Sequence, residues 1–149
     1  MLLMTKDRKG RIVLEATLVF PLVVFVMLSF VMMQMAVLEA SVLNQTTAEM
    51  VKVLAAGGMG EEALAALLVE LTGLPMGLLA DRDSELSREE SVGFLLRMDD
   101  SGLLCADRVD SVFIGRKEGY YQAKLVYRSA FIPGMLLNSR AMERSWGHD

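Results

Sequence analysis

The chain has 149 residues, is 53% hydrophobic and carries a formal net charge of −4. This length allows one modest domain, of about 100 to 150 residues, together with a short anchor. The acidic balance argues against a nucleic-acid partner, because neutralising phosphates requires clustered lysine and arginine. Cys105 is the only cysteine, which excludes an internal disulfide.

The N-terminal region combines a basic leader with a long apolar run. Residues 1–10 have a net positive charge, and no charged side chain occurs from Ala16 to Leu38. A helix over this run is roughly 35 Å long, enough to cross a bilayer core of about 30 Å. The positive-inside rule then predicts a single-pass protein of the cytoplasmic membrane, with its N-terminus inside and its C-terminal domain extracytoplasmic. Membrane lipid is therefore an expected partner.

Two simpler interpretations of this run compete. A secretory signal peptide has a shorter apolar core, of about 7 to 15 residues, followed by a small-residue cleavage site, which Met35-Ala36-Val37 matches poorly. A plain signal anchor fits the length and the flanking charges. It does not explain the spacing of Gly10, Glu15 and Pro21.

Those three residues resemble the start of a type IV prepilin, in which a basic leader ends in glycine and glutamate is the fifth residue of the mature chain. Cleavage between Gly10 and Arg11 would make Glu15 that fifth residue. More narrowly, the string Val13-Leu14-Glu15-Ala16-Thr17-Leu18-Val19-Phe20-Pro21-Leu22 is similar to TadE-type pseudopilins of tight-adherence (Tad/Flp) pilus systems. Residues 9 to about 45 carry most of the resemblance.

The chain also departs from the main pilus subunits of those systems. Major Flp pilins are very short and have tyrosine after the glutamate, whereas Ala16 follows Glu15 here and about a hundred residues follow the helix. A minor component is therefore the expectation. The resemblance implies that prepilin peptidase, other pilins or pseudopilins and the pilus assembly machinery are its partners, and that it joins a pilus or a related secretion apparatus.

The resemblance also gives roles to single residues. Cleavage would release the amine of Arg11 to meet Glu15 of a neighbouring subunit; snorkelling of Glu15 to the headgroups is the simpler alternative. Pro21 removes one backbone donor and is expected to kink or loosen the helix, either with a role in extraction or packing or as a tolerated membrane proline. The competing function is a single-pass membrane-anchored accessory or sensor protein with an extracytoplasmic domain that keeps its leader.

Beyond the span, the helix is expected to continue as an amphipathic stem that ends at Gly57-Gly58. Its predicted packing positions recur at steps of three and four residues: Met35, Leu38, Val42, Thr46, Met50, Val53 and Leu54. A short helix is expected over Glu61–Leu71, closed by Gly73 and Pro75, and a short element over Ser91–Met98.

The period then changes from helical to alternating, which predicts an antiparallel hairpin around Lys117-Glu118-Gly119 and a third strand within Leu136–Trp146. The expected fold class is α+β and pilin-like: a long N-terminal transmembrane and stem helix packed against a small antiparallel β-sheet head with one or two short helices. The expected segments are residues 1–10 as leader, 11–57 as transmembrane and stem helix, 58–107 as the helical and loop region, and 108–149 as strands.

The sequence offers no pattern for catalysis, a cofactor or a metal. His148 is the only histidine, and no glycine-rich phosphate loop occurs. The acidic run Asp81–Glu90 departs from an EF-hand, because Leu86 and Val92 stand at its sixth and twelfth positions. Cys105 lies among apolar neighbours and is expected to be a buried, inert thiol. An anchored hydrolase with an unrecognised site is the remaining enzymatic alternative.

Overall fold

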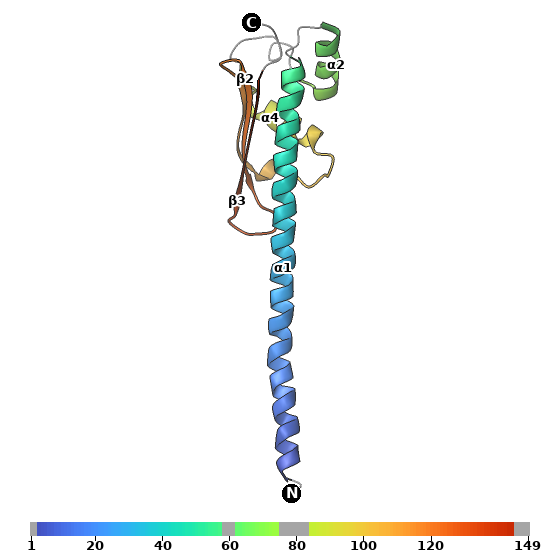
Figure 1. Cartoon of the computed structure of the whole chain (residues 1–149), viewed down its shortest axis with the longest axis vertical. Coiled ribbons are helices and arrows are strands. Elements are labelled where there is room, and N and C mark those ends of the chain that lie inside the picture. The colour runs from blue at the N-terminus through green and yellow to red at the C-terminus, as the bar shows by residue number, and fades with distance from the viewer. Residues whose placement is uncertain (1–2, 58–61, 75–83, 145–149) are drawn as a thin grey trace. The chain divides into compact units, whose positions relative to one another are not determined.

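The computed structural model describes residues 3–57, 62–74 and 84–144 (Figure 1). Their elements are α1 (Leu3–Gly57), α2 (Glu62–Thr72), α4 (Arg88–Met98), the 3-10 turn η1 (Ala106–Arg108), β1 (Val109–Lys117), β2 (Tyr120–Arg128) and β3 (Leu136–Arg144). The predicted α+β, pilin-like class is confirmed, with a long N-terminal helix, a small antiparallel sheet and short helices. The chain divides into two compact units, Met1–Met35 and Ala36–Asp149.

The first unit is the N-terminal part of α1, and its side chains are exposed from Gly10 to Met35. Phe20 is 72% exposed and Phe25 is 69% exposed, values far above those of a core helix. The most apolar 18-residue window has a mean hydropathy of 2.5, and none of it is buried. By length and composition, α1 is able to cross a membrane as a single-pass anchor.

Two hydroxyl groups of this unit, those of Thr17 and Ser29, form hydrogen bonds within the helix. Thr17 donates to the carbonyl of Val13 at 2.7 Å, and Ser29 donates to the carbonyl of Phe25 at 2.9 Å. Such back-bonding suits a helix in lipid, where no water is present to accept these bonds.

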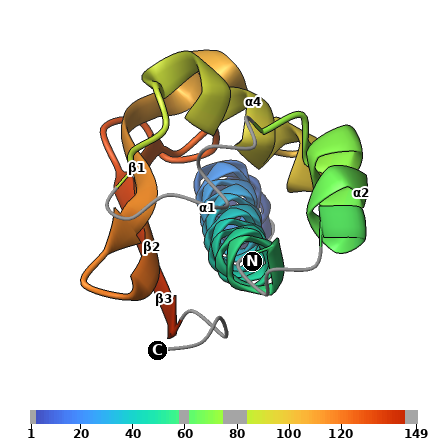
Figure 2. The ribbon, with the colours of Figure 1, turned by 90° about the horizontal axis from the view of Figure 1, so that it is seen from above.

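The second unit is the head, in which residues 36–57 of α1 pack against the sheet. The sheet has the order β1-β2-β3 with antiparallel neighbours. Glu118 and Gly119 form the predicted hairpin turn, both with positive φ, 55° and 82°. Inward-facing residues of β2 are buried and alternate with more exposed ones, as predicted. Figure 2 shows this part of α1 between the sheet and α2, with α4 beside β1.

The buried stripe of the stem differs from the prediction. Thr46, Met50 and Leu54 are buried as expected, but Met35 and Leu38 are 37% and 47% exposed. The stripe instead begins at Ala36 and Glu39 and continues through Leu43, Thr46, Thr47, Met50, Val51, Leu54 and Ala55. At the start of the stem, the buried positions are shifted by one residue from the predicted ones. This shift places the carboxylate of Glu39 inside the head.

The short elements complete the core around this stripe. Ser87 and Glu90 form a capping box that starts α4, and Phe94 and Leu95 on the same helix are buried against α1 and the sheet. Gly73, with φ 67°, follows α2 at the position where a helix commonly ends. Residues 84–86 cover the outer edge of β1 through backbone hydrogen bonds. In one of them the N–H of Leu86 donates to Ile114 O at 2.9 Å.

The expectation that Cys105 is buried is wrong, because its side chain is exposed. Cys105 lies in extended backbone, where successive side chains point to opposite sides, and Leu104 takes the inward position with 5% exposure. The N–H of Cys105 donates to the hydroxyl of Tyr127 at 3.0 Å. The thiol therefore faces solvent while its backbone is tied to the core.

Several predictions fall on residues that lie outside the described ones. They concern Gly58 after the stem, Pro75, the first residues of the acidic run at 81–83, and the C-terminal segment that includes Trp146 and His148.

Candidate functional site

The residues predicted for processing and assembly all lie on α1. Gly10, Arg11, Glu15 and Pro21 follow one another along the exposed first unit. Arg11 Nε lies 3.1 Å from Glu15 Oε1, and the two side chains are 82% and 62% exposed. An exposed pair of this spacing contributes about 0.3–0.5 kcal/mol in water, and arginine before glutamate is the weaker order. The full-length chain thus gives Glu15 a weak cationic partner on its own helix.

Pro21 lies within α1, and the helix runs through it without interruption. Its ring nitrogen carries no hydrogen, so the carbonyl of Thr17 receives no helical bond from this position. Thr17 itself donates its hydroxyl to Val13 O. The helix therefore lacks one backbone hydrogen bond at Pro21 and gains one side-chain bond at Val13.

A second carboxylate on α1 has the opposite environment. Glu39 is 0% exposed within the head. Its Oε2 accepts a hydrogen bond from Ser129 Oγ at 2.7 Å, and its Oε1 and Oε2 accept from the N–H of Ala130 at 3.0 and 3.2 Å. Ser129 and Ala130 begin the connection between β2 and β3, so these bonds join α1 to a segment 90 residues later.

The bonds to Glu39 come from neutral donors. Of the ion pairs among the described residues, none includes Glu39. Burying a carboxylate away from water is costly unless hydrogen bonds replace its hydration. The two donors at the start of the β2–β3 connection therefore allow this acid to occupy the packed stripe.

Tyr127 lies close to this junction at the end of β2. Its ring is 0% exposed. Burial raises the pKa of Tyr127, the hydrogen bond from the N–H of Cys105 lowers it, and the negative charge of Glu39 raises it further. The phenol therefore stays neutral and hydrogen-bonded across the ordinary pH range.

Sequence reasoning missed both Glu39 and Ser129. One signal was present for Glu39: a lone acid at the end of the apolar run, spaced four residues before Leu43 and seven before Thr46. For Ser129 the one signal is its position as a short polar residue four positions before Pro133-Gly134.

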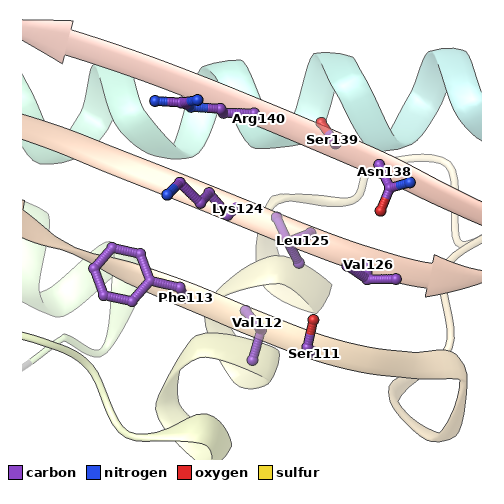
Figure 3. Close-up of a pocket in the computed structure, with 9 residues that line it drawn as sticks. All are labelled: Ser111, Val112, Phe113, Lys124, Leu125, Val126, Asn138, Ser139 and Arg140. Carbon is purple, nitrogen blue, oxygen red and sulfur yellow. The ribbon is translucent and has the colours of Figure 1, made fainter.

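The open face of the sheet carries a shallow depression of about 510 Å³ (Figure 3). Phe113, Lys124 and Arg140 lie in one row across the three strands at matching register positions. Like charges opposite each other in a ladder repel, so an anion is the chemically favoured contact for this row. Within the described ranges, no group of three or more histidine, cysteine, aspartate or glutamate residues is placed to hold a metal ion.

Comparisons with protein families, with curated proteins and with solved structures found no match for this chain.

Proposed function

We propose that the protein is a minor pseudopilin of the TadE type, cut by prepilin peptidase after Gly10 and taking part in the assembly of a Tad/Flp-type pilus or related secretion apparatus. The observation that carries this proposal is the placement of Glu15. It is five residues after Gly10, immediately before a charge-free run, on a helix whose apolar side chains are exposed.

Glu15 and Arg11 suggest how cleavage is coupled to assembly. In the uncut chain, Glu15 pairs with the Arg11 side chain on the same helix at 3.1 Å. Cleavage adds a second positive group, the α-amine of Arg11, at a chain end that a neighbouring subunit can present. A carboxylate in the membrane costs about 3 kcal/mol when it lacks a partner. Pairing between subunits removes this cost, and the uncut chain cannot offer the amine.

The apolar surface of the first unit provides the remaining contacts. Side chains such as Leu18, 69% exposed, and Met27, 66% exposed, face either lipid or the helices of other subunits. Helices in membranes associate by close packing and by polar bonds. A contact between two different surfaces of like subunits propagates as a filament, the symmetry that a pilus requires.

Intact-mass measurement of the protein from membranes tests the cleavage step. In cells with an active prepilin peptidase the mature chain is expected to begin at Arg11, and in cells with an inactivated peptidase at Met1. Glu15→Ala serves as a control that leaves Gly10 in place and tests assembly separately. A chain that begins at Met1 in the presence of active peptidase contradicts the proposal and favours the membrane-anchored accessory or sensor protein.

The exposed thiol of Cys105 tests the proposed topology. It is the only cysteine of the chain, and it lies in the head. A membrane-impermeant maleimide should label it from outside in spheroplasts whose cytoplasmic membrane is intact. Labelling only after the cells are broken places the head in the cytoplasm and contradicts the extracytoplasmic assignment.

A further inference from the structure

The connection between β2 and β3 has an unusual composition for an exposed loop. No charged side chain occurs from Ser129 to Leu137. Met135 and Leu136 are 39% and 50% exposed, and Pro133 is also exposed. Loops of soluble domains are commonly polar at such positions, whereas this one presents several apolar side chains together.

The backbone of this loop is hydrogen-bonded within the protein. Ser129 N–H donates to Met135 O at 3.0 Å, and Met135 N–H donates to Ile132 O at 3.2 Å. The hydroxyl of Ser129 accepts from two further amides, those of Phe131 and Ile132, at 3.2 and 3.3 Å. The N–H of Ala130 donates to Glu39, and Pro133 has no N–H to satisfy. A loop with so few free amides is suited to a medium that offers no hydrogen bonds.

The junction with Glu39 fixes where this loop lies along α1. Glu39 is the first charged residue after the apolar run, and the preceding residues Val37 and Leu38 are 62% and 47% exposed. Glu39 directly follows Leu38, the last residue of the charge-free stretch, and its carboxylate is bonded to Ser129 and Ala130 of the loop. The loop is therefore held beside the part of the helix at which the charge-free stretch ends. Figure 1 shows it against α1, at the end of the sheet opposite the β1–β2 turn.

From these observations we propose that the β2–β3 loop, residues 129–136, inserts its apolar tip into the interface of the same bilayer that α1 crosses. Met135 and Leu136 enter the boundary between headgroups and acyl chains, and Glu39 holds the loop at that depth. The occupant of this apolar surface is lipid, because the loop is bonded to Glu39, next to exposed Val37 and Leu38 at the end of the charge-free run, and because most of its amides are already hydrogen-bonded. The head then has two membrane contacts.

Site-directed spin labelling of the full-length chain tests this proposal. Cys105→Ser removes the native thiol, and Met135→Cys and Met142→Cys are then labelled one at a time. The two methionines are matched, since they are 39% and 46% exposed and Met142 lies on the same strand as the loop's end. Seven strand residues, about 24 Å, separate them. The labelled proteins are placed in vesicles of phosphatidylethanolamine and phosphatidylglycerol.

Collisions with oxygen, which concentrates in lipid, and with a water-soluble nickel chelate distinguish the outcomes. At position 135 oxygen collisions are expected to exceed chelate collisions, and at position 142 the order is expected to reverse. Equal chelate access at both positions overturns the proposal, because the loop then lies in water. Shielding of position 135 from both reagents also overturns it, because protein then covers the loop.

This proposal rests on membrane anchoring by α1 and not on pilus assembly. The labelled chain retains Gly10 and its leader throughout, so neither cleavage nor other subunits are required. A chain that is never cut in cells leaves the expected label accessibility unchanged, and failure of the label pattern leaves the cleavage test unchanged.

Discussion

Removing the carboxylate of Glu39 should destabilise the head by detaching the β2–β3 loop from α1. In Glu39→Ala, the N–H of Ala130 and the hydroxyl hydrogen of Ser129 lose their acceptor; Ser129 is buried, whereas Ala130 is exposed and its N–H can bond to water. An unsatisfied buried donor costs about 1–3 kcal/mol, while the variant regains the cost of burying the acid. We expect a net loss of about 1–3 kcal/mol in the free energy of unfolding of the head.

Glu39→Gln separates charge from shape. Its amide oxygen can still accept from Ala130, but its amide nitrogen is placed near Ser129 Oγ, which already accepts two backbone amides. The expected loss is about 1 kcal/mol, the value of one ordinary hydrogen bond. The order of stability is therefore expected to be wild type, then glutamine, then alanine.

Thermal unfolding in detergent, followed by near-ultraviolet circular dichroism, measures these effects in the full-length protein. The buried rings of Tyr121 and Tyr127 report the head, whereas the far-ultraviolet signal is dominated by α1. At about 4 °C for each kcal/mol, Glu39→Ala should lower Tm by about 4 to 12 °C. Glu49→Ala is the matched control on the same helix, since the Glu49 carboxylate accepts only from exposed Gln45, and its effect should stay within about 0.5 kcal/mol.

A glutamine variant as stable as wild type, or more stable, refutes this reasoning. That result means that the cost of burying the carboxylate exceeds the value of its bonds. The double variant with Ser129→Ala gives an independent check. If Glu39 acts through Ser129, the double variant loses less stability than the sum of the two single variants. Additive losses place the role of Glu39 elsewhere.

Three further predictions concern other parts of the chain. Glu15→Ala should insert in the membrane but be depleted from sheared surface pili, and wild-type incorporation measured by immunoblot contradicts its role. Gly115→Ala places a Cβ 2.8 Å from Ser84 O and should lower the free energy of unfolding of the head by about 1–3 kcal/mol. Hydrogen exchange at the amide of Leu86 should then be faster, and unchanged exchange contradicts this prediction. Because burial raises the pKa of Tyr127, head stability should fall as pH rises above about 10, where the unfolded tyrosine loses its proton first; a flat alkaline Tm profile contradicts this.

The elements that sequence predicted well are those whose period directly reflects burial. The alternation of Tyr121, Ala123, Leu125 and Tyr127 corresponds to one buried face of β2. The hairpin turn follows from Glu118-Gly119, because glycine tolerates the positive φ that such a turn requires. These features depend on neighbours in the sequence, so a single chain is sufficient to recognise them.

The features that sequence missed depend on contacts between distant residues. The predicted stripe of the stem left out Glu39, whose residue type is ordinarily found at the surface. Its acceptors are satisfied by Ser129 and Ala130, some 90 residues away, which no local pattern indicates. Cys105 was misplaced for a related reason: apolar neighbours suggested burial, but extended backbone sends only alternate residues inward.

Glu15 and Glu39 stand at the two ends of one charge-free stretch, and their environments explain why a chain can keep both. Glu39 finds its hydrogen bonds inside its own head and is completely buried. Glu15 forms a weak pair with Arg11 on an exposed helix, which leaves its carboxylate accessible to another molecule. Glu39 is thus a fixed feature of the fold, and Glu15 is a polar group suited to assembly. The charge-free stretch between them is about the length that a bilayer core requires, which fits one acid to each side of the span.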